Sequence, residues 1–123
     1  MAYNDFTEMP VWQLGYSIVQ EVYALTEKLP KSEDYALKGQ LRDASMSITG
    51  NIAEAFGRHH AKDKINFYYF SRASAFEIKS HLICGSGVGY FAQYEIDNII
   101  LKCSDLIEEI NKIIKTLSNG IRN

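Results

Sequence analysis

The sequence predicts an all-α protein, an antiparallel up-down-up-down four-helix bundle, and three observations support this fold class. Only two of the 123 residues are proline, and no proline follows Pro30. An all-β chain of this length would use more proline and glycine in its turns. Apolar side chains recur at helical spacing in four segments. The connections between these segments are short, which favours antiparallel packing of consecutive helices.

The first helix is expected at about residues 10–28. Pro10 suits the first helical turn, where its missing N–H group is not needed, and Pro30 closes the segment. Apolar side chains three and four residues apart form one continuous face. Three further residues widen that face: Trp12, Val19 and Tyr23.

The second and third helices are expected at about residues 32–56 and 62–84. Ser32 is a suitable N-cap for the second helix, and Gly57 is a suitable terminator. The third segment is unusually aromatic, but its apolar residues keep helical spacing and no turn interrupts it. A glycine-rich connection at residues 85–89 is expected to end it.

The fourth helix, expected at about residues 95–117, has the clearest pattern. Its main apolar seam repeats every 3.5 residues, the period of coiled-coil packing. A second column lies beside this seam: Ile100, Ile107 and Ile114. One helix in one bundle rarely needs so wide a stripe. The column therefore predicts either a wider core contact or an exposed patch for self-association, with Trp12, Val19 and Tyr23 as the complementary face. A contact between two different surfaces must close into a ring to avoid filaments.

The length predicts one domain, residues 1–123, with an ordered core at about residues 10–117. The longest stretch without Asp, Glu, Lys or Arg is residues 80–94, which is too short and too rich in glycine to span a bilayer. No cleavable signal is visible. Cys84 and Cys103 make no disulfide framework. These features favour a cytoplasmic protein with reduced thiols and no membrane partner.

Charge is distributed unevenly along the chain. Residues 38–81 carry seven basic and four acidic side chains, whereas the remainder carries six basic and eleven acidic ones. All three histidines also lie in the basic segment. A chain that is close to neutral overall can still present a basic face to phosphate groups. The alternative is a chance scatter of charges over solvated helix faces.

The sequence shows no arrangement typical of an enzyme or a cofactor site. Four-helix bundles often hold metal with Glu-x-x-His pairs, but the third residue after Glu54 is Gly57 and the third after Glu77 is Ser80. No nucleophile stands beside a suitable base. We expect no catalytic activity, no cofactor and no metal.

Polar residues interrupt the apolar pattern of the second and third helices. Asn51 falls on the apolar seam of the second helix, and Ser74 and Glu77 interrupt the third. If the chain turns near His60, residues whose numbers sum to about 120 lie at one level of an antiparallel pair. This places Arg42 opposite Glu77 and Ser47 close to Ser74. The expected polar cluster, with either a structural or a functional role, is Arg42, Ser47, Asn51, Glu54, Ser74 and Glu77.

These same residues resemble a known family. Gln40-Leu41-Arg42, Asn51-Ile52-Ala53-Glu54 and Phe56-Gly57-Arg58, with Val11-Trp12 and the pair Ser74 and Glu77, are similar to the signature of four-helix-bundle proteins encoded by intervening sequences in bacterial 23S ribosomal RNA genes. The resemblance covers about residues 10–117. It implies a cytoplasmic bundle that forms a ring, typically a homopentamer, without established catalytic activity.

The family's relatives include accessory proteins of diversity-generating retroelements, which bind nucleic acid and a reverse transcriptase. The resemblance therefore implies that RNA or DNA, and a nucleic-acid enzyme, are candidate partners. The candidate phosphate contacts are Arg42, Arg58, Lys62, Lys64 and Arg72. The leading hypothesis is a non-enzymatic homo-oligomer that binds structured RNA or DNA through a basic face. The alternative is an oligomeric protein–protein scaffold that makes no direct contact with nucleic acid.

Overall fold

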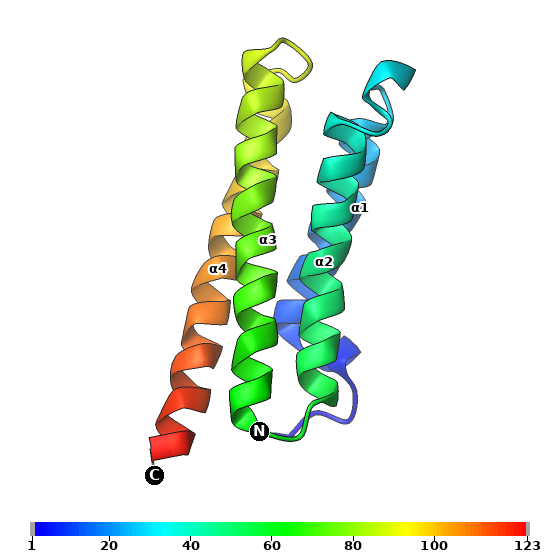
Figure 1. Cartoon of the computed structure of the whole chain (residues 1–123). Coiled ribbons are helices and arrows are strands. Elements are labelled where there is room, and N and C mark those ends of the chain that lie inside the picture. The colour runs from blue at the N-terminus through cyan, green and yellow to red at the C-terminus, as the bar shows by residue number, and fades with distance from the viewer. Residues whose placement is uncertain (1, 123) are drawn as a thin grey trace.

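The computed structural model describes residues 2–122 and contains four long α-helices in that range (Figure 1). They are α1 (Pro10–Thr26), α2 (Leu37–Gly57), α3 (Ala61–Gly87) and α4 (Gln93–Arg122). Two short 3-10 helices, η1 (Phe6–Glu8) and η2 (Lys31–Glu33), precede α1 and α2. No strand occurs among these residues. The predicted all-α four-helix bundle is confirmed.

Neighbouring helices are joined by hydrogen bonds whose pairing shows their relative direction. Between α2 and α3, Ser71 donates to the carbonyl oxygen of Ile48 and Ser74 donates to Ser47. As the residue number rises on one helix it falls on the other, so the two helices are antiparallel. Side-chain bonds between α3 and α4, and between α1 and α4, follow the same rule. Helices α1 and α3 lie diagonally across the bundle, as do α2 and α4.

The start of α2 differs from the expected one. Ser32 is not the N-cap, because residues 31–33 form η2 and α2 begins five residues later, at Leu37. The carboxylate of Glu33 accepts a hydrogen bond from the backbone N–H of Leu37 at 3.0 Å. An acidic side chain upstream of the helix thus satisfies one of its free N–H groups.

The end of α3 also differs from the prediction, because the helix continues through Gly85 to Gly87. Gly85 is buried, and a Cβ atom there would lie 2.5 Å from the ring of Phe91. This glycine therefore permits close packing within the helix, while the chain turns two residues later. Gly89, with a φ of +93°, supplies the left-handed conformation of that turn.

The core runs along the bundle axis and is formed by side chains from all four helices. Ile18, Leu41, Ile48, Ile78 and Leu106 are fully buried, and each contributes about 1.5–3 kcal/mol through burial. Gly15 lets α1 approach α2, since a Cβ atom there would lie 3.0 Å from Ile48.

The expected exposed column on α4 is wrong, and the alternative of a wider core contact is correct. Ile107 and Ile114 are only 9% and 8% exposed, and Ile100 is partly buried against the core. Ser104 and Asn111, which flank Ile107 by one helical turn on each side, bond to side chains of α3. The column therefore faces α3 within the same chain.

Candidate nucleic-acid interface

The five cations expected to contact phosphate do not lie together. Arg42 bonds back to α1: it donates to the hydroxyl of Thr26 at 2.9 Å and to the carbonyl oxygen of Tyr23 at 3.1 Å. Its guanidinium also pairs with Glu27 and lies 4.4 Å from the centre of the Tyr23 ring. Arg42 thus satisfies carbonyl and hydroxyl groups at the C-terminal end of α1. The expected pairing of Arg42 with Glu77 is wrong, because Arg42 lies on the side of α2 that faces α1.

Lys64 has a similar structural role at the end of α2. Its ammonium group donates to the carbonyl oxygens of Ala55 and Phe56, at 3.0 and 3.3 Å. These carbonyls belong to the last turn of α2, where backbone acceptors lack helical partners and positive charge is favourable. Lys64 therefore joins the start of α3 to the end of α2.

Arg72 lies on the face of the bundle formed by α3 and α4. It donates to Asn111 at 2.7 Å, and its guanidinium lies 4.7 Å from the ring centre of Tyr69. Seven residues, or about two helical turns, further along α3, Lys79 repeats the arrangement, with Ser104 as acceptor and Phe76 as the ring. These two cations hold exposed aromatic rings in place beside α4.

Of the remaining two cations, Arg58 lies in the connection between α2 and α3, and Lys62 lies in the first turn of α3. Arg58, His59, His60 and Lys62, which we call the basic turn, are all exposed. No acidic residue occurs between residues 58 and 62. Arg58 pairs with Glu54 at 3.2 Å and lies over the ring of Phe67. Sequence reasoning identified Arg58 and Lys62 but did not link them to the two histidines.

Part of the expected polar cluster does form between α2 and α3. Ser74 donates to the hydroxyl of Ser47 at 2.8 Å, which confirms their predicted proximity. The amide of Asn51 donates to the same hydroxyl and to the carbonyl oxygen of Ser47. Buried Ser71, which the sequence analysis missed, donates to the carbonyl oxygen of Ile48. These hydrogen bonds tie the two helices together.

The other two members of the cluster bond within their own helices. Glu54 pairs with Arg58, and Glu77 lies 3.1 Å from the imidazole of His81. The six residues therefore form four separate local contacts, counting that of Arg42 with α1, and not one site. No group of three or more His, Cys, Asp or Glu residues within the described part of the chain is placed to hold a metal ion.

Two apolar ridges lie on opposite faces of the bundle. The α1–α2 ridge contains exposed Tyr16, Tyr23 and Met46, with Trp12 stacked on Tyr16 and half-buried Val19 beside them. The α3–α4 ridge consists of Tyr69, Phe76, Ile83 and Leu101, each 42–59% exposed. Because α1 and α3 are diagonal neighbours, the α1–α2 face and the α3–α4 face point in opposite directions. Trp12, Val19 and Tyr23 thus lie on an outer face, as expected, while the isoleucine column of α4 does not.

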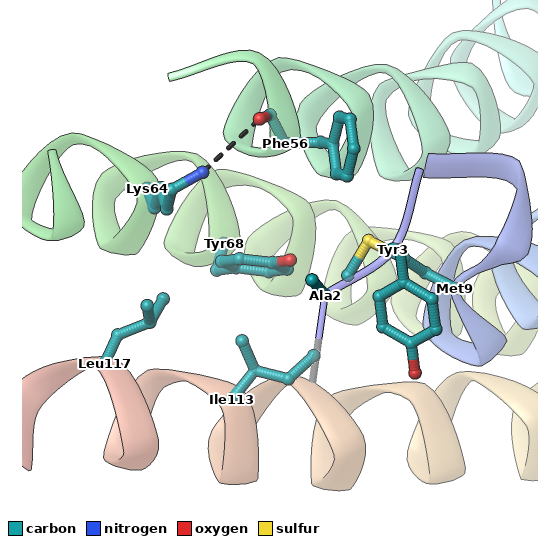
Figure 2. A pocket seen from close by; sticks show the side chains of 8 residues that line it. All are labelled: Ala2, Tyr3, Met9, Phe56, Lys64, Tyr68, Ile113 and Leu117. Carbon is teal, nitrogen blue, oxygen red and sulfur yellow. Dashed lines mark hydrogen bonds between the residues drawn. The ribbon is translucent and has the colours of Figure 1, made fainter. Parts of the chain in front are cut away.

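A cavity of about 340 Å³ opens at the end of the bundle that carries the basic turn (Figure 2). The N-terminal segment forms one wall and the ends of three helices form the others. The lining residues are Ala2, Tyr3, Met9, Phe56, Lys64, Tyr68, Ile113 and Leu117. A smaller cavity of about 180 Å³ shares Tyr3, Met9 and Ile113 with it. Burial raises the pKa of Tyr68, so its hydroxyl stays protonated and able to donate.

Comparisons with known proteins relate this fold to one group. A family model described as 23S rRNA-intervening sequence protein matches residues 7–115. Among solved structures, the chain is similar to a protein of unknown function from the S23 ribosomal protein family of Bacteroides thetaiotaomicron VPI-5482. The TM-score is 0.76 at 18% identity, with 85% of this chain and 98% of that chain covered, so the likeness shows a shared fold. No curated protein matches the chain. Within residues 2–122, the helices are too short or too polar to cross a bilayer.

Proposed function

The chain belongs to the 23S rRNA-intervening sequence protein family, and on this premise we propose that it is a non-catalytic, self-assembling protein of the cytoplasm that binds structured RNA, or DNA, through its basic turn. The proposed binding of RNA or DNA is supported mainly by one observation. The basic turn, which consists of Arg58, His59, His60 and Lys62, is exposed at one end of the bundle. Phosphate groups are recognised mainly by accessible Lys and Arg side chains, here Lys62 and Arg58, and a neutral imidazole can donate one further hydrogen bond.

The basic turn is favoured over the other cations by what each side chain already contacts. Arg42 and Lys64 are engaged with helix C-terminal ends, and Arg72 is held between Tyr69 and Asn111. Lys62, by contrast, is exposed and has no ion-pair partner within residues 2–122. Arg58 pairs with Glu54 and lies over Phe67, but its side chain stays 45% exposed. Helix α3 begins directly after His60, so the positive end of its dipole points toward the same turn.

Self-assembly is supported by the two opposite ridges. Large apolar side chains gathered on one surface are typical of protein interfaces. A contact between the α1–α2 ridge of one copy and the α3–α4 ridge of the next is heterologous, so repeated contacts produce either a closed ring or a filament. We propose a closed ring, with the number five taken only from the family resemblance. In such a ring every basic turn lies at the same rim.

Binding to nucleic acid is tested by a mobility-shift assay with structured RNA and with duplex DNA over a series of salt concentrations. We expect affinity that falls as salt rises, because phosphate contacts release counterions, with a logarithmic slope of about −0.9 for each contact on a duplex. Absence of affinity for either nucleic acid at low salt would contradict this part of the proposal. Capture of one protein partner that survives nuclease treatment would instead favour the scaffold alternative, with a nucleic-acid enzyme as one candidate.

Assembly is tested by light scattering on Tyr16→Asp, Phe76→Asp and a control, Tyr35→Asp, whose side chain is 99% exposed away from both ridges. The wild type and the control are expected to form the oligomer, and the two ridge variants are expected to be monomers. Each ridge variant keeps one intact ridge, so an equimolar mixture should form dimers that cannot grow. A wild-type mass of 14 kDa at micromolar concentration would refute self-assembly.

A further inference from the structure

The wall of the larger cavity is a well-anchored part of the fold. The N-terminal segment, residues 2–9, crosses the end of the bundle and approaches α4 there (Figure 2). The carboxylate of Glu8 accepts hydrogen bonds from the backbone N–H groups of Asn4 and Asp5, which fixes the turn of this segment. The ring of Phe6 packs edge-on against Trp12 and Phe56. The cavity is therefore bounded by ordered contacts on the side of the N-terminal segment.

The lining is mostly apolar, and two of its residues carry donors with a free hydrogen. Lys64 uses two of its three donor hydrogens on backbone carbonyls, and no carboxylate lies within ion-pair distance of it in residues 2–122. The ring of Tyr68 is buried, while its hydroxyl makes no hydrogen bond to the described residues and is open to the cavity. Figure 2 shows the Tyr68 ring between Lys64 and the α4 side chains Ile113 and Leu117. Positive charge thus stands at the edge of an apolar chamber without an anion to balance it.

We propose that this cavity binds an amphipathic carboxylic acid, a role that goes beyond the proposed binding of nucleic acid. The carboxylate accepts from the free donor of Lys64, and the apolar body passes the edge of the Tyr68 ring to contact Ile113 and Leu117 on α4. Pockets that combine an apolar lining with a few polar groups are typical of small-molecule sites. If each atom fills about 30 Å³, the volume of liquid water per molecule, the cavity holds about ten non-hydrogen atoms. Octanoate matches both the size and the charge.

The first test is calorimetric titration of the wild-type protein with octanoate and with octyltrimethylammonium, a cation of similar length. We expect saturable binding of one octanoate per chain, at least tenfold tighter than binding of the cation. Equal affinity for the two compounds would mean a merely apolar contact and would overturn the proposal. Absence of saturable octanoate binding at millimolar concentration would also overturn it.

Variants then locate the site. Ile113→Trp fills the cavity and should abolish binding, whereas Lys64→Met should remove the preference for the anion. Lys112→Met is the matched control, because Lys112 is on α4 beside the cavity but its ammonium is exposed and pairs with Glu109. Circular dichroism checks that each variant keeps its helices. Unchanged binding in folded Ile113→Trp would overturn the assignment.

Nuclear magnetic resonance of the wild type keeps the test decisive even if both cavity variants unfold. Octanoate should shift the backbone signals of Met9, Tyr68 and Leu117, which line the cavity, and leave those of Phe91 at the other end unchanged. Shifts spread over the exposed ridges would contradict the proposed site.

Discussion

The two ends of the bundle are built from the same helices but differ in how completely they are filled. At the end where α3 turns into α4, Phe91 is only 3% exposed and packs directly on buried Gly85. We call this the closed end. The other end carries the N-terminal segment, the basic turn and the C-terminal end of α4 (Figure 1). Side chains there surround a cavity of about 340 Å³. We call this the open end.

Polar contacts show the same difference. At the closed end, Tyr90 donates to Glu33, and this hydrogen bond is the main cause that raises the pKa of Tyr90. Lys28 binds Glu95, which lowers the pKa of that carboxyl group. Both of these acidic side chains bond across the bundle. At the open end, Lys62 and Lys64 have no acidic partner in the described residues. The two ends therefore differ in how tightly their side chains pack, and both proposed binding roles are placed at the open end.

The largest expected effect is removal of the Phe91 side chain. Phe91→Ala leaves a cavity at a site where neighbouring atoms are already in contact, and such changes cost about 3–5 kcal/mol. Leu117→Ala at the open end enlarges an existing cavity and removes a partly exposed side chain, so it should cost much less. Chemical denaturation of both variants measures the difference. Equal losses would mean that the two ends are equally packed.

A smaller effect is expected when a methyl group is added at the closed end. Gly85→Ala places a Cβ atom 2.5 Å from the ring of Phe91, and overpacking of this kind costs about 1–3 kcal/mol. Gly87→Ala is the matched control, since nothing lies within 4 Å of the added atom and the residue is helical. The control should be neutral or slightly stabilising. A neutral Gly85→Ala variant would show that the closed end has room to adjust.

The anchor between α1 and α2 should contribute less again. Arg42→Ala removes two charge-assisted hydrogen bonds, one to the hydroxyl of the fully buried Thr26 and one to the carbonyl oxygen of Tyr23, and should cost about 1–2 kcal/mol. Lys112→Ala removes only an exposed ion pair with Glu109, and should cost less than about 0.5 kcal/mol. Melting temperatures compare the two variants directly. Similar, negligible shifts would mean that Arg42 has no structural role.

The smallest expected effect is a dependence of stability on alkaline pH in the middle of the bundle. Burial raises the pKa of Cys103 from 9.0 to about 12. The folded state therefore retains the proton that the unfolded state loses above pH 9, and stability falls as the pH rises from 9 toward 12. At pH 10 this group should cost about 1.4 kcal/mol relative to pH 8. The Cys103→Ala variant should not show this loss of stability between pH 9 and pH 12. Identical stability–pH profiles for the variant and the wild type would contradict the prediction.

The sequence predicts the interior of this molecule better than its surface contacts. The 3.5-residue period of α4 identifies Ile99, Cys103 and Leu106, which are buried, because burial follows directly from apolar periodicity. The antiparallel level rule also places Ser47 near Ser74. Both results depend only on spacing along one helix or on one turn.

Other features depend on how far each helix rotates about its axis, which spacing along one chain does not specify. Arg42 lies at the same level as Glu77 but faces α1. Ile107 and Ile114 are covered because α4 turns this column toward α3. The glycine-rich sequence around Gly85 is typical of a turn, yet Gly85 lies inside α3. It is a glycine because the ring of Phe91 occupies the space that a Cβ atom would take. The cavity depends on the N-terminal segment, which has no periodic pattern.

The central claim is that the open end is the binding end, and charge-matched variants at the two ends test it most directly. One double variant is Arg58→Gln with Lys62→Gln at the open end, and the other is Lys31→Gln with Lys38→Gln at the closed end. Both remove two positive charges, so non-specific electrostatics change equally. RNA affinity at fixed salt should fall at least tenfold for the open-end variant, with a salt slope smaller by about two, and should change little for the closed-end variant. Equal losses in both variants, or a larger loss at the closed end, would contradict the account.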